Sequence, residues 1–280
     1  MGKLKIKKSL LLILTIFSFN PLHAQKLELQ SISSDKYQFG FNFNKAFYST
    51  DVNMSTFSGV YQLSWNVPFS SGLNIIGNIP YITTSYHINF VYFGDYEFSE
   101  NGFGNIFLGL QTISKPEDSK RSIYSFGLYL PTASDRAAIN GYLSDYYYLT
   151  KYLRNTLGIY FNYAFHKMED EGFNYGFEIG PDLLIPTGDN NSDVELLIHY
   201  GILGSFVINK FILNMEFLGN ATLTSDVNDF GDRFVNMLNI GAQWKESIIT
   251  PMIYFKIYLR DDINRSIDGV LGIGVNVSIE

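Results

Sequence analysis

The chain has 280 residues, no cysteine and a formal net charge of −7. Without cysteine, disulfides, thiolate nucleophiles, zinc–thiolate sites and a lipid anchor on cysteine are excluded. An acidic chain is also a poor candidate for nucleic-acid binding, which depends on basic patches. A mean hydropathy of +0.02, with 16% aromatic residues, favours strands over membrane-spanning helices.

Residues 1–24 predict a signal peptide that is cleaved after Ala24. Four lysines between Lys3 and Lys8 precede an apolar stretch from Leu10 to about Phe19. The alternative is a membrane anchor, but this stretch has only about ten residues where a spanning helix needs roughly twenty. Removing the four lysines leaves 16 basic against 27 acidic residues, so the mature chain 25–280 has a net charge of −11.

The mature chain alternates between apolar and polar residues at period two. The first clear case is residues 37–44, in which every second residue is Tyr or Phe and the others are Gln, Gly or Asn. The pattern returns in residues 157–165, 173–182 and 271–279. It is noisier in residues 61–67, 73–81, 106–112, 124–130, 211–217, 238–244 and 253–259. Such alternation is the signature of membrane-spanning strands.

Two segments do not fit this pattern simply. Residues 194–208 alternate over a length that exceeds the nine to eleven residues of a typical spanning strand. They are either two strands joined at Gly201–Gly204 or one strand that projects beyond the membrane. Residues 146–153 have no clear phase.

The connections divide into short turns and longer loops, which are typical of the periplasmic and external ends of a barrel. We assign to the periplasmic end residues 68–72, 114–120, 153–155, 186–192 and 245–247. We assign to the external end residues 49–56, 84–101, 132–145, 167–172, 222–232 and 261–266. A chain that starts and ends in the periplasm has an even number of strands, and the segments predict 12 or 14.

A soluble β-sandwich or lipocalin-like barrel is the main alternative fold, because it also alternates. Its packed interior would need Val, Leu and Ile where these strands carry Asn, Gly and Glu. No linker divides the chain. We therefore predict an all-β protein with one domain, residues 25–280, that forms a transmembrane antiparallel up-and-down β-barrel.

Four short segments resemble a known family: Asn78–Ile82, Gly102–Gln111, Phe126–Asp135 and Ile185–Asn190. They are similar to the Gly-Asp-Ile-x-Leu-Gly and Leu-Pro-Thr-Gly elements of outer-membrane proteins of the phenol-degradation MetA-pathway type. The resemblance covers about the middle half of the chain, and it implies a barrel that passes small molecules, hydrophobic ones included.

The chain departs from this family pattern at three places. Asn105 stands where an aspartate is usual, and Ala133 replaces the first glycine of the Pro-Thr-Gly elements. The chain ends Ser278-Ile279-Glu280, without the aromatic residue that commonly ends the assembly signal of the family.

The sequence offers little for catalysis. After the signal peptide there are three histidines, His87, His166 and His199, and none lies in the His-x-Ser arrangement of outer-membrane phospholipases. His199 shares the polar phase of its strand with Glu195, which suggests an acid–base pair or an ordinary hydrogen bond facing the lumen. Carboxylates cluster in residues 169–171 and 226–232, and solvated loops explain them better than calcium sites. We predict no catalytic residue, cofactor or specific metal.

Charged residues on the polar phase of the strands are the candidate site. They are Glu178, Asp182, Glu195, Glu216, Lys256 and Arg260. A charged side chain that faces lipid at the midplane costs roughly 2–4 kcal/mol, so these residues are expected to point into the lumen. They are either opposed charges that tune the selectivity of an open channel or a salt-bridge network that plugs the barrel.

The functional prediction is a monomeric channel or transporter for small molecules in the cell outer membrane of a Gram-negative-type bacterium. Its expected partners are outer-membrane lipid and small hydrophobic solutes, and nucleic acid is not among them. One alternative is a structural or surface-interaction barrel whose loop 84–101, with Tyr86, Tyr92, Phe93 and Tyr96, contacts a partner. A lipid-modifying enzyme is the third possibility.

Overall fold

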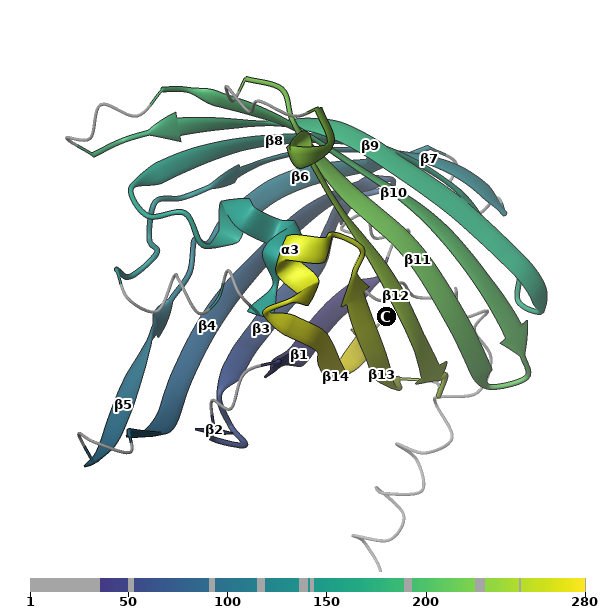
Figure 1. The fold of residues 1–280 in the computed structure, drawn as a ribbon. Coiled ribbons are helices and arrows are strands. Elements are labelled where there is room, and N and C mark those ends of the chain that lie inside the picture. Colours follow the sequence, from purple (N-terminus) through teal and green to yellow (C-terminus); the bar gives the residue numbers. More distant parts are fainter. Residues whose placement is uncertain are drawn as a thin grey trace, which may run out of the picture.

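A computed structural model describes residues 36–49, 53–90, 94–114, 119–135, 141, 144–188, 193–224, 230–246 and 248–279. Within these residues, antiparallel strands close into a barrel (Figure 1). The predicted signal peptide lies outside the described residues. No helix in the described part of the chain is long and apolar enough to cross a membrane.

The strands follow one another along the chain with short helical segments between some of them. The strands are β1 (Tyr37–Tyr48), β2 (Asn53–Met54), β3 (Gly59–Ser70), β4 (Leu73–Phe90), β5 (Gly94–Phe103), β6 (Phe107–Ile113), β7 (Lys120–Tyr129), β8 (Thr156–Lys167), β9 (Gly172–Pro186), β10 (Glu195–Ile208), β11 (Phe211–Thr222), β12 (Phe234–Trp244), β13 (Ile249–Tyr258) and β14 (Ile267–Ile279). The helical segments are η1 (Tyr146–Lys151), η2 (Phe230–Arg233) and α3 (Asp261–Asn264).

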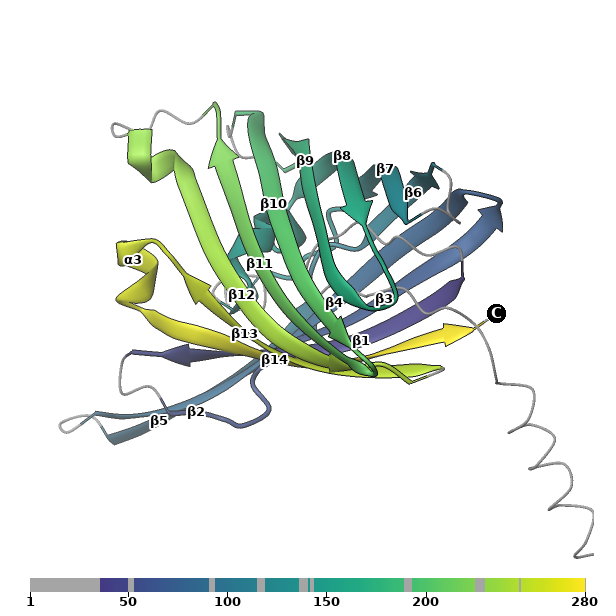
Figure 2. The same cartoon turned by 90° about the vertical axis from the view of Figure 1, so that its right-hand side faces the viewer.

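Twelve of the described strands form the closed ring, in the order β4-β3-β1-β14-β13-β12-β11-β10-β9-β8-β7-β6 and back to β4. The first and last strands, β1 and β14, pair over their whole length. The predicted all-β transmembrane barrel is confirmed, with the lower of the two predicted strand counts. The remaining strands, β2 and β5, pair with the part of β4 that continues beyond the ring, which Figure 2 shows reaching past the other strands.

Strand β4 changes its partner part-way along its length. Its first residues pair with β6 as far as Asn78, and from Tyr81 onward it pairs with β5. Pro80 lies between these two ladders, where its missing N–H group cannot donate to a partner. The chain between β5 and β6 leaves the sheet at Gly104–Ile106, which brings Asn105 to the inside of the barrel, where it is fully buried.

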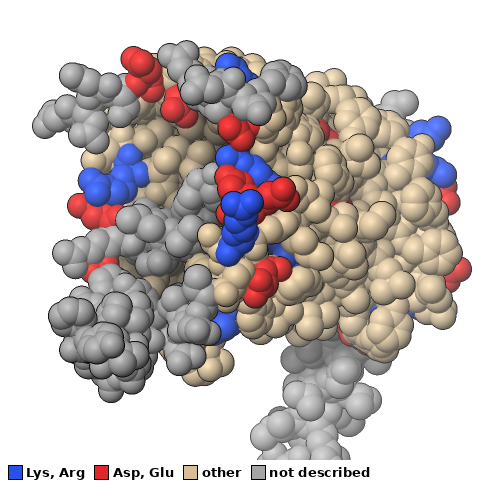
Figure 3. All heavy atoms as spheres, in the orientation of Figure 1, with Lys and Arg blue, Asp and Glu red and all other residues tan. Residues whose placement is uncertain are grey.

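The outer face of the barrel is apolar. Phe39, Phe41, Phe161 and Ile273 are 43%, 47%, 44% and 48% exposed, so the outer face carries the aromatic phase of the strands. Figure 3 shows a broad area of uncharged residues on the outer wall, with charged residues gathered toward its ends. Exposing this apolar surface to water would cost much free energy, whereas hydrocarbon can cover it at little cost. The soluble alternative is therefore excluded.

The two ends of the barrel differ in their connections. One end, here called the turn rim, carries both ends of the described chain and the short connections after β3, β6, β8, β10 and β12. The opposite end, the loop rim, carries the longer connections. Three predicted assignments were wrong: residues 167–172 form a tight turn at the turn rim, whereas 153–155 and 186–192 belong to connections at the loop rim.

The strand bounds also show which of the remaining sequence expectations are correct. Residues 195–208 form the single strand β10, whose pairing with β9 and β11 continues through Gly201–Gly204. Residues 84–101, expected as a loop, are mostly the extended β4–β5 hairpin. The side chains of Tyr86, Tyr92, Phe93 and Tyr96 lie outside the described residues. Residues 146–151, which had no clear phase, form η1 and no strand.

Candidate functional site

The inner face of the barrel is rich in side-chain amides. These side chains come from strands all around the ring and occupy the polar phase of each strand. Asn44, Asn66, Asn74, Gln111, Asn162, Asn174, Asn214, Asn239 and Gln243 are at most 3% exposed. Amides donate and accept hydrogen bonds without net charge, so they form polar, neutral parts of a wall that also carries buried apolar side chains such as Ile212 and Met252.

The described residues between β7 and β8, which are 130–135, 141 and 144–155, fold into the barrel and are here called the inward segment (Figure 1). The Lys151 ammonium group donates to the Gln62 amide oxygen of β3 at 3.1 Å. The Tyr147 hydroxyl donates to the Tyr200 carbonyl of β10 at 3.4 Å. Since β3 and β10 lie on opposite sides of the ring, the inward segment crosses the lumen.

A buried ion pair holds the inward segment to the wall. The Asp145 carboxylate accepts from Lys256 of β13 at 2.9 Å, and both side chains are fully buried. The other Asp145 oxygen accepts from the Tyr152 hydroxyl at 3.2 Å and lies 3.8 Å from the Lys151 ammonium group. That ammonium group also lies 3.6 Å from the centre of the Tyr148 ring. Each charge in this cluster therefore has a close partner, as burial requires.

Asn105 ties both ends of the inward segment together. Its side-chain amide donates to the Thr150 carbonyl at 2.9 Å and to the Leu153 carbonyl at 2.7 Å. Its side-chain oxygen accepts from the Ala133 backbone N–H at 2.9 Å. An aspartate could not donate these two hydrogen bonds when ionised, so the departure from the family pattern matches the local geometry.

A second buried cluster lies on β8, β9 and β10 beside the inward segment. The His199 ring contacts the Asp182 carboxylate at 3.3 Å through Nδ1 and the Asn162 oxygen at 3.1 Å through Nε2. Asn162 in turn donates to the Glu178 carboxylate at 3.3 Å, and the Tyr160 ring stacks on His199. His199, Asp182 and Glu178 border a cavity of about 10 Å³, together with Tyr147 and other residues. This volume is about the space that one water molecule needs.

The six predicted site residues differ in their surroundings. Glu178, Asp182, Glu216 and Lys256 are buried inside the barrel, at 2%, 8%, 0% and 0% exposure. Glu195 occupies the same phase as His199 but is exposed at the loop rim. Arg260 lies beyond the end of β13, where it pairs with Asp262 at 2.7 Å.

The structure brings only some of these residues together. Glu178 and Asp182 are linked through Asn162 and His199. Glu216 accepts from Asn239 at 3.1 Å. Lys256 pairs with Asp145, a residue that the strand pattern did not identify because it lies in the inward segment. The absence of a clear phase over residues 146–153 was the one available signal for this segment.

The residues that the sequence offered for catalysis or metal binding have other contacts than expected. The alternative of an acid–base pair between His199 and Glu195 is wrong, whereas the alternative of an ordinary hydrogen bond facing the lumen matches the contacts of His199 with Asp182 and Asn162. Of the two carboxylate clusters, Glu169 pairs with Lys167 at 2.8 Å, while Asp226 and Asp229 lie outside the described residues. Among the residues that the structure describes, no three of His, Asp and Glu form a metal-binding group.

The sequence matches a known family. The model of the family described as "Putative MetA-pathway of phenol degradation" matches residues 38–206, more than half of the chain. The chain belongs to this family. The four segments that carry the predicted resemblance all lie within the matched range, so this resemblance is confirmed. No curated protein matches the chain.

Solved structures share the fold of this family member at low sequence identity. The COG4313 outer membrane channel from Pseudomonas putida F1 superposes with a TM-score of 0.62 at 11% identity, covering 91% of this chain and 100% of that one. The NanC porin gives 0.52 at 10% identity, with 87% and 100% covered. The KdgM porin gives 0.50 at 7% identity, with 87% and 99% covered. A closed barrel with an apolar outer face spans an outer membrane, which confirms the predicted location.

Proposed function

We propose that this chain is a channel for small molecules across the outer membrane, and that the inward segment limits the size of the solute. The observation that supports a size limit is that this segment bridges β3 and β10 through Lys151 and Tyr147. The outer membrane channel and porins that share its fold support transport as the class of function.

The chemistry of the interior suits solutes that have both polar and apolar parts. Toward the loop rim, Tyr147 and Tyr148 pack against an apolar cluster that includes Leu218, Met237 and Val270. Farther from the loop rim, the wall is lined with buried amides such as Asn214 and Gln243. Tyrosine offers both a ring face and a hydroxyl group, so it can contact an apolar ring and a polar substituent. Small aromatic or otherwise hydrophobic molecules with a polar group are therefore the proposed substrates.

The buried charges would then tune the selectivity of the channel. Glu178, Asp182 and Glu216 line one part of the interior on β9–β11, whereas Lys256 lies on β13 and is neutralised by Asp145. Because Glu178, Asp182 and Glu216 all lie on β9–β11, this part of the wall is rich in carboxylates, and it should favour cations over anions. Replacing Glu178 and Glu216 with glutamine should reduce this preference, which the reversal potential in a salt gradient measures.

Liposome swelling and single-channel recording test the proposal. Vesicles that contain the purified barrel should swell in an isotonic pentose faster than in a trisaccharide, because the inward segment leaves room only for small solutes. A barrel that gives neither swelling nor conductance is no channel, and the interpretation as a surface-interaction barrel would replace it. Lipid hydrolysis by the wild type that is lost in His199→Ala would instead establish an enzyme.

Two further expectations complete the proposal. The barrel acts as a monomer, and light scattering in detergent should give the mass of one chain. Residues 1–24 are removed on export, so N-terminal sequencing of the protein from outer membranes should begin at Gln25. A mature chain that retains Met1 would contradict the signal peptide.

A further inference from the structure

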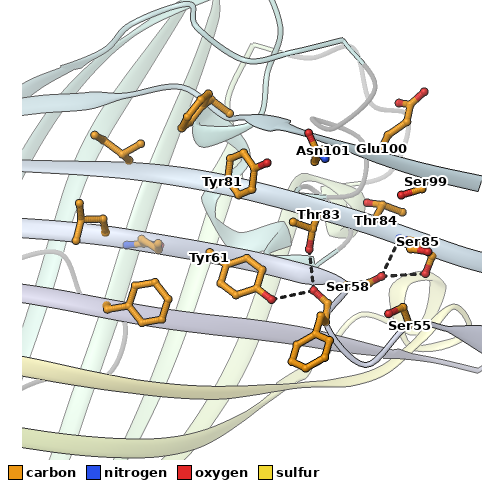
Figure 4. A pocket seen from close by; sticks show the side chains of 16 residues that line it. Ser55, Ser58, Tyr61, Tyr81, Thr83, Thr84, Ser85, Ser99, Glu100 and Asn101 are labelled. Atoms are coloured by element: carbon orange, nitrogen blue, oxygen red, sulfur yellow. Dashed lines mark hydrogen bonds between the residues drawn. The ribbon is translucent and has the colours of Figure 1, made fainter.

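A groove of about 630 Å³ lies on the outer face of the barrel, over β3, β4 and β5 (Figure 4). Gln62, Thr84 and Glu100 line it from the inward phase of these strands. Most of its lining side chains are on the outward phase, so the groove faces the membrane. Among them, Leu63 and Phe103 are 47% and 52% exposed. The volume is within the range of sites that bind small ligands.

An irregular connection between β2 and β3 builds one wall of this groove. The Phe57 carbonyl accepts from the Tyr61 hydroxyl at 3.0 Å and from the Thr83 hydroxyl at 2.7 Å, as Figure 4 shows. The Ser58 hydroxyl donates to the Ser85 carbonyl at 2.9 Å and fixes the connection to β4. These bonds leave the Phe57 ring 74% exposed beside the groove.

The strand register arranges the lining in rows that change from apolar to polar. Phe41, Leu63 and Ile79 are neighbours across three strands. The next row toward the loop rim contains Tyr61, Tyr81 and Phe103. Beyond it come Thr83 with Asn101, and then Ser85 with Ser99. The groove is therefore apolar on its membrane side and rich in hydroxyl groups toward the loop rim.

A lysine lies at the polar end of the groove. Lys45, on the outward phase of β1, donates to the carbonyl of Ser55, which lines the groove, at 2.6 Å. The carboxylate among the lining residues belongs to Glu100 on β5, across the polar end from Ser55 in Figure 4. A cation on the outward face of a barrel is costly within hydrocarbon, and its cost falls near the headgroups. Lys45 therefore marks the level of the polar headgroups.

We propose that this groove binds one anionic membrane lipid, with an acyl chain against Leu63, Ile79 and Phe103 and the headgroup phosphate beside Lys45. The apolar rows are continuous with the lipid-covered outer face, so an acyl chain is the apolar ligand that reaches them without leaving the membrane. The hydroxyl groups and the Asn101 amide supply donors to the headgroup, and Lys45 supplies the opposite charge. This inference does not depend on transport through the lumen.

Native mass spectrometry of the barrel in a nonionic detergent tests the proposal. The barrel is titrated with dioleoyl phosphatidylglycerol or with zwitterionic dioleoyl phosphatidylcholine. The wild type should retain one phosphatidylglycerol, with about fivefold preference over phosphatidylcholine, the effect expected of one lysine near a headgroup. Lys45→Gln should remove this preference. Lys210→Gln, at an exposed lysine of the turn rim that pairs with Glu246, should keep it.

A second pair of variants tests the acyl chain contact independently of charge. Ile79→Trp fills the floor of the groove and should reduce the retention of both lipids. Ile240→Trp, at an outward position of β12 that is 49% exposed, should leave retention unchanged. Folding of every variant is checked by its heat-dependent gel mobility. If Lys45→Gln keeps the preference, or if Ile79→Trp behaves like Ile240→Trp, the groove does not bind an anionic lipid.

Discussion

Asn105 shows how one side chain can fix a whole segment of the chain. It is fully buried and donates to the Thr150 and Leu153 carbonyls. Asn105→Asp replaces the donor with an acceptor that faces both carbonyls, and we expect a loss of about 2–4 kcal/mol in the free energy of unfolding. Urea unfolding in lipid vesicles measures this loss. Asn155→Asp, at a residue outside this hydrogen-bond set, is the control, and an equal loss there would contradict the role of Asn105.

The Asp145–Lys256 pair predicts a non-additive effect. Lys256→Met leaves the Asp145 carboxylate buried without its closest partner, and we expect a loss of about 3 kcal/mol in the free energy of unfolding. The double variant Asp145→Asn/Lys256→Met should recover part of this loss, because the buried carboxylate and the Lys256 cation are removed together and Lys151 keeps its contacts with Gln62 and Tyr148. The same urea titration compares the variants. A double variant as unstable as Lys256→Met alone would show that the pairing is unimportant.

Which of these residues can be predicted depends on whether they lie in a strand. The burial of Glu178, Glu216 and Lys256 follows from period-two alternation, since the phase of a strand fixes the side of each residue. Their partners do not follow, because pairing across the lumen depends on how far neighbouring strands are shifted. Asp145 and Asn105 lie in irregular chain, where no period assigns a side.

At the level of elements, contact with lipid determines which side chains the outward phase of each strand tolerates. Phe161, near the middle of β8, should be far more sensitive to charge than Phe211, at the turn-rim end of β11. We expect Phe161→Arg to lower the free energy of unfolding by about 2–4 kcal/mol and Phe211→Arg by about 0–1 kcal/mol. Unfolding in vesicles checks both values. Equal losses would mean that the membrane does not cover the barrel as its apolar face indicates.

Connections were harder to predict than strands because length alone does not decide their position. Residues 167–172 were expected at the external end as one of the longer segments, yet β8 and β9 pair as far as Lys167 and Tyr175, so the chain turns at the turn rim. The β4–β5 hairpin was expected as a loop because its alternation is weak where it leaves the membrane. Lipid enforces period two only along the spanning part of a strand, so the sequence signal ends there although the strand continues.

For the whole molecule, the inward segment decides whether twelve strands enclose an open channel or a narrow one. Barrels of this size are wide enough for a lumen, so a segment that crosses the lumen should dominate resistance to ion flow. Replacing residues 136–151 with a short Gly-Ser linker removes Asp145, Lys151, Tyr147 and Tyr148, and Lys256→Met in the same chain removes the cation that pairs with Asp145 in the wild type. We expect single-channel conductance to rise severalfold and a trisaccharide to enter liposomes as fast as a pentose.

The matched control shortens the connection between β9 and β10, which also leaves from the loop rim. Residues 187–193 replaced by Gly-Ser should leave conductance near the wild-type value, because their neighbours Pro186 and Glu195 end their strands at the rim. Unchanged conductance in the variant without the inward segment would place the narrowest point elsewhere in the lumen. The amide-lined part toward the turn rim would then be the place that sets solute size, since Asn214, Asn239 and Gln243 project into it from β11 and β12.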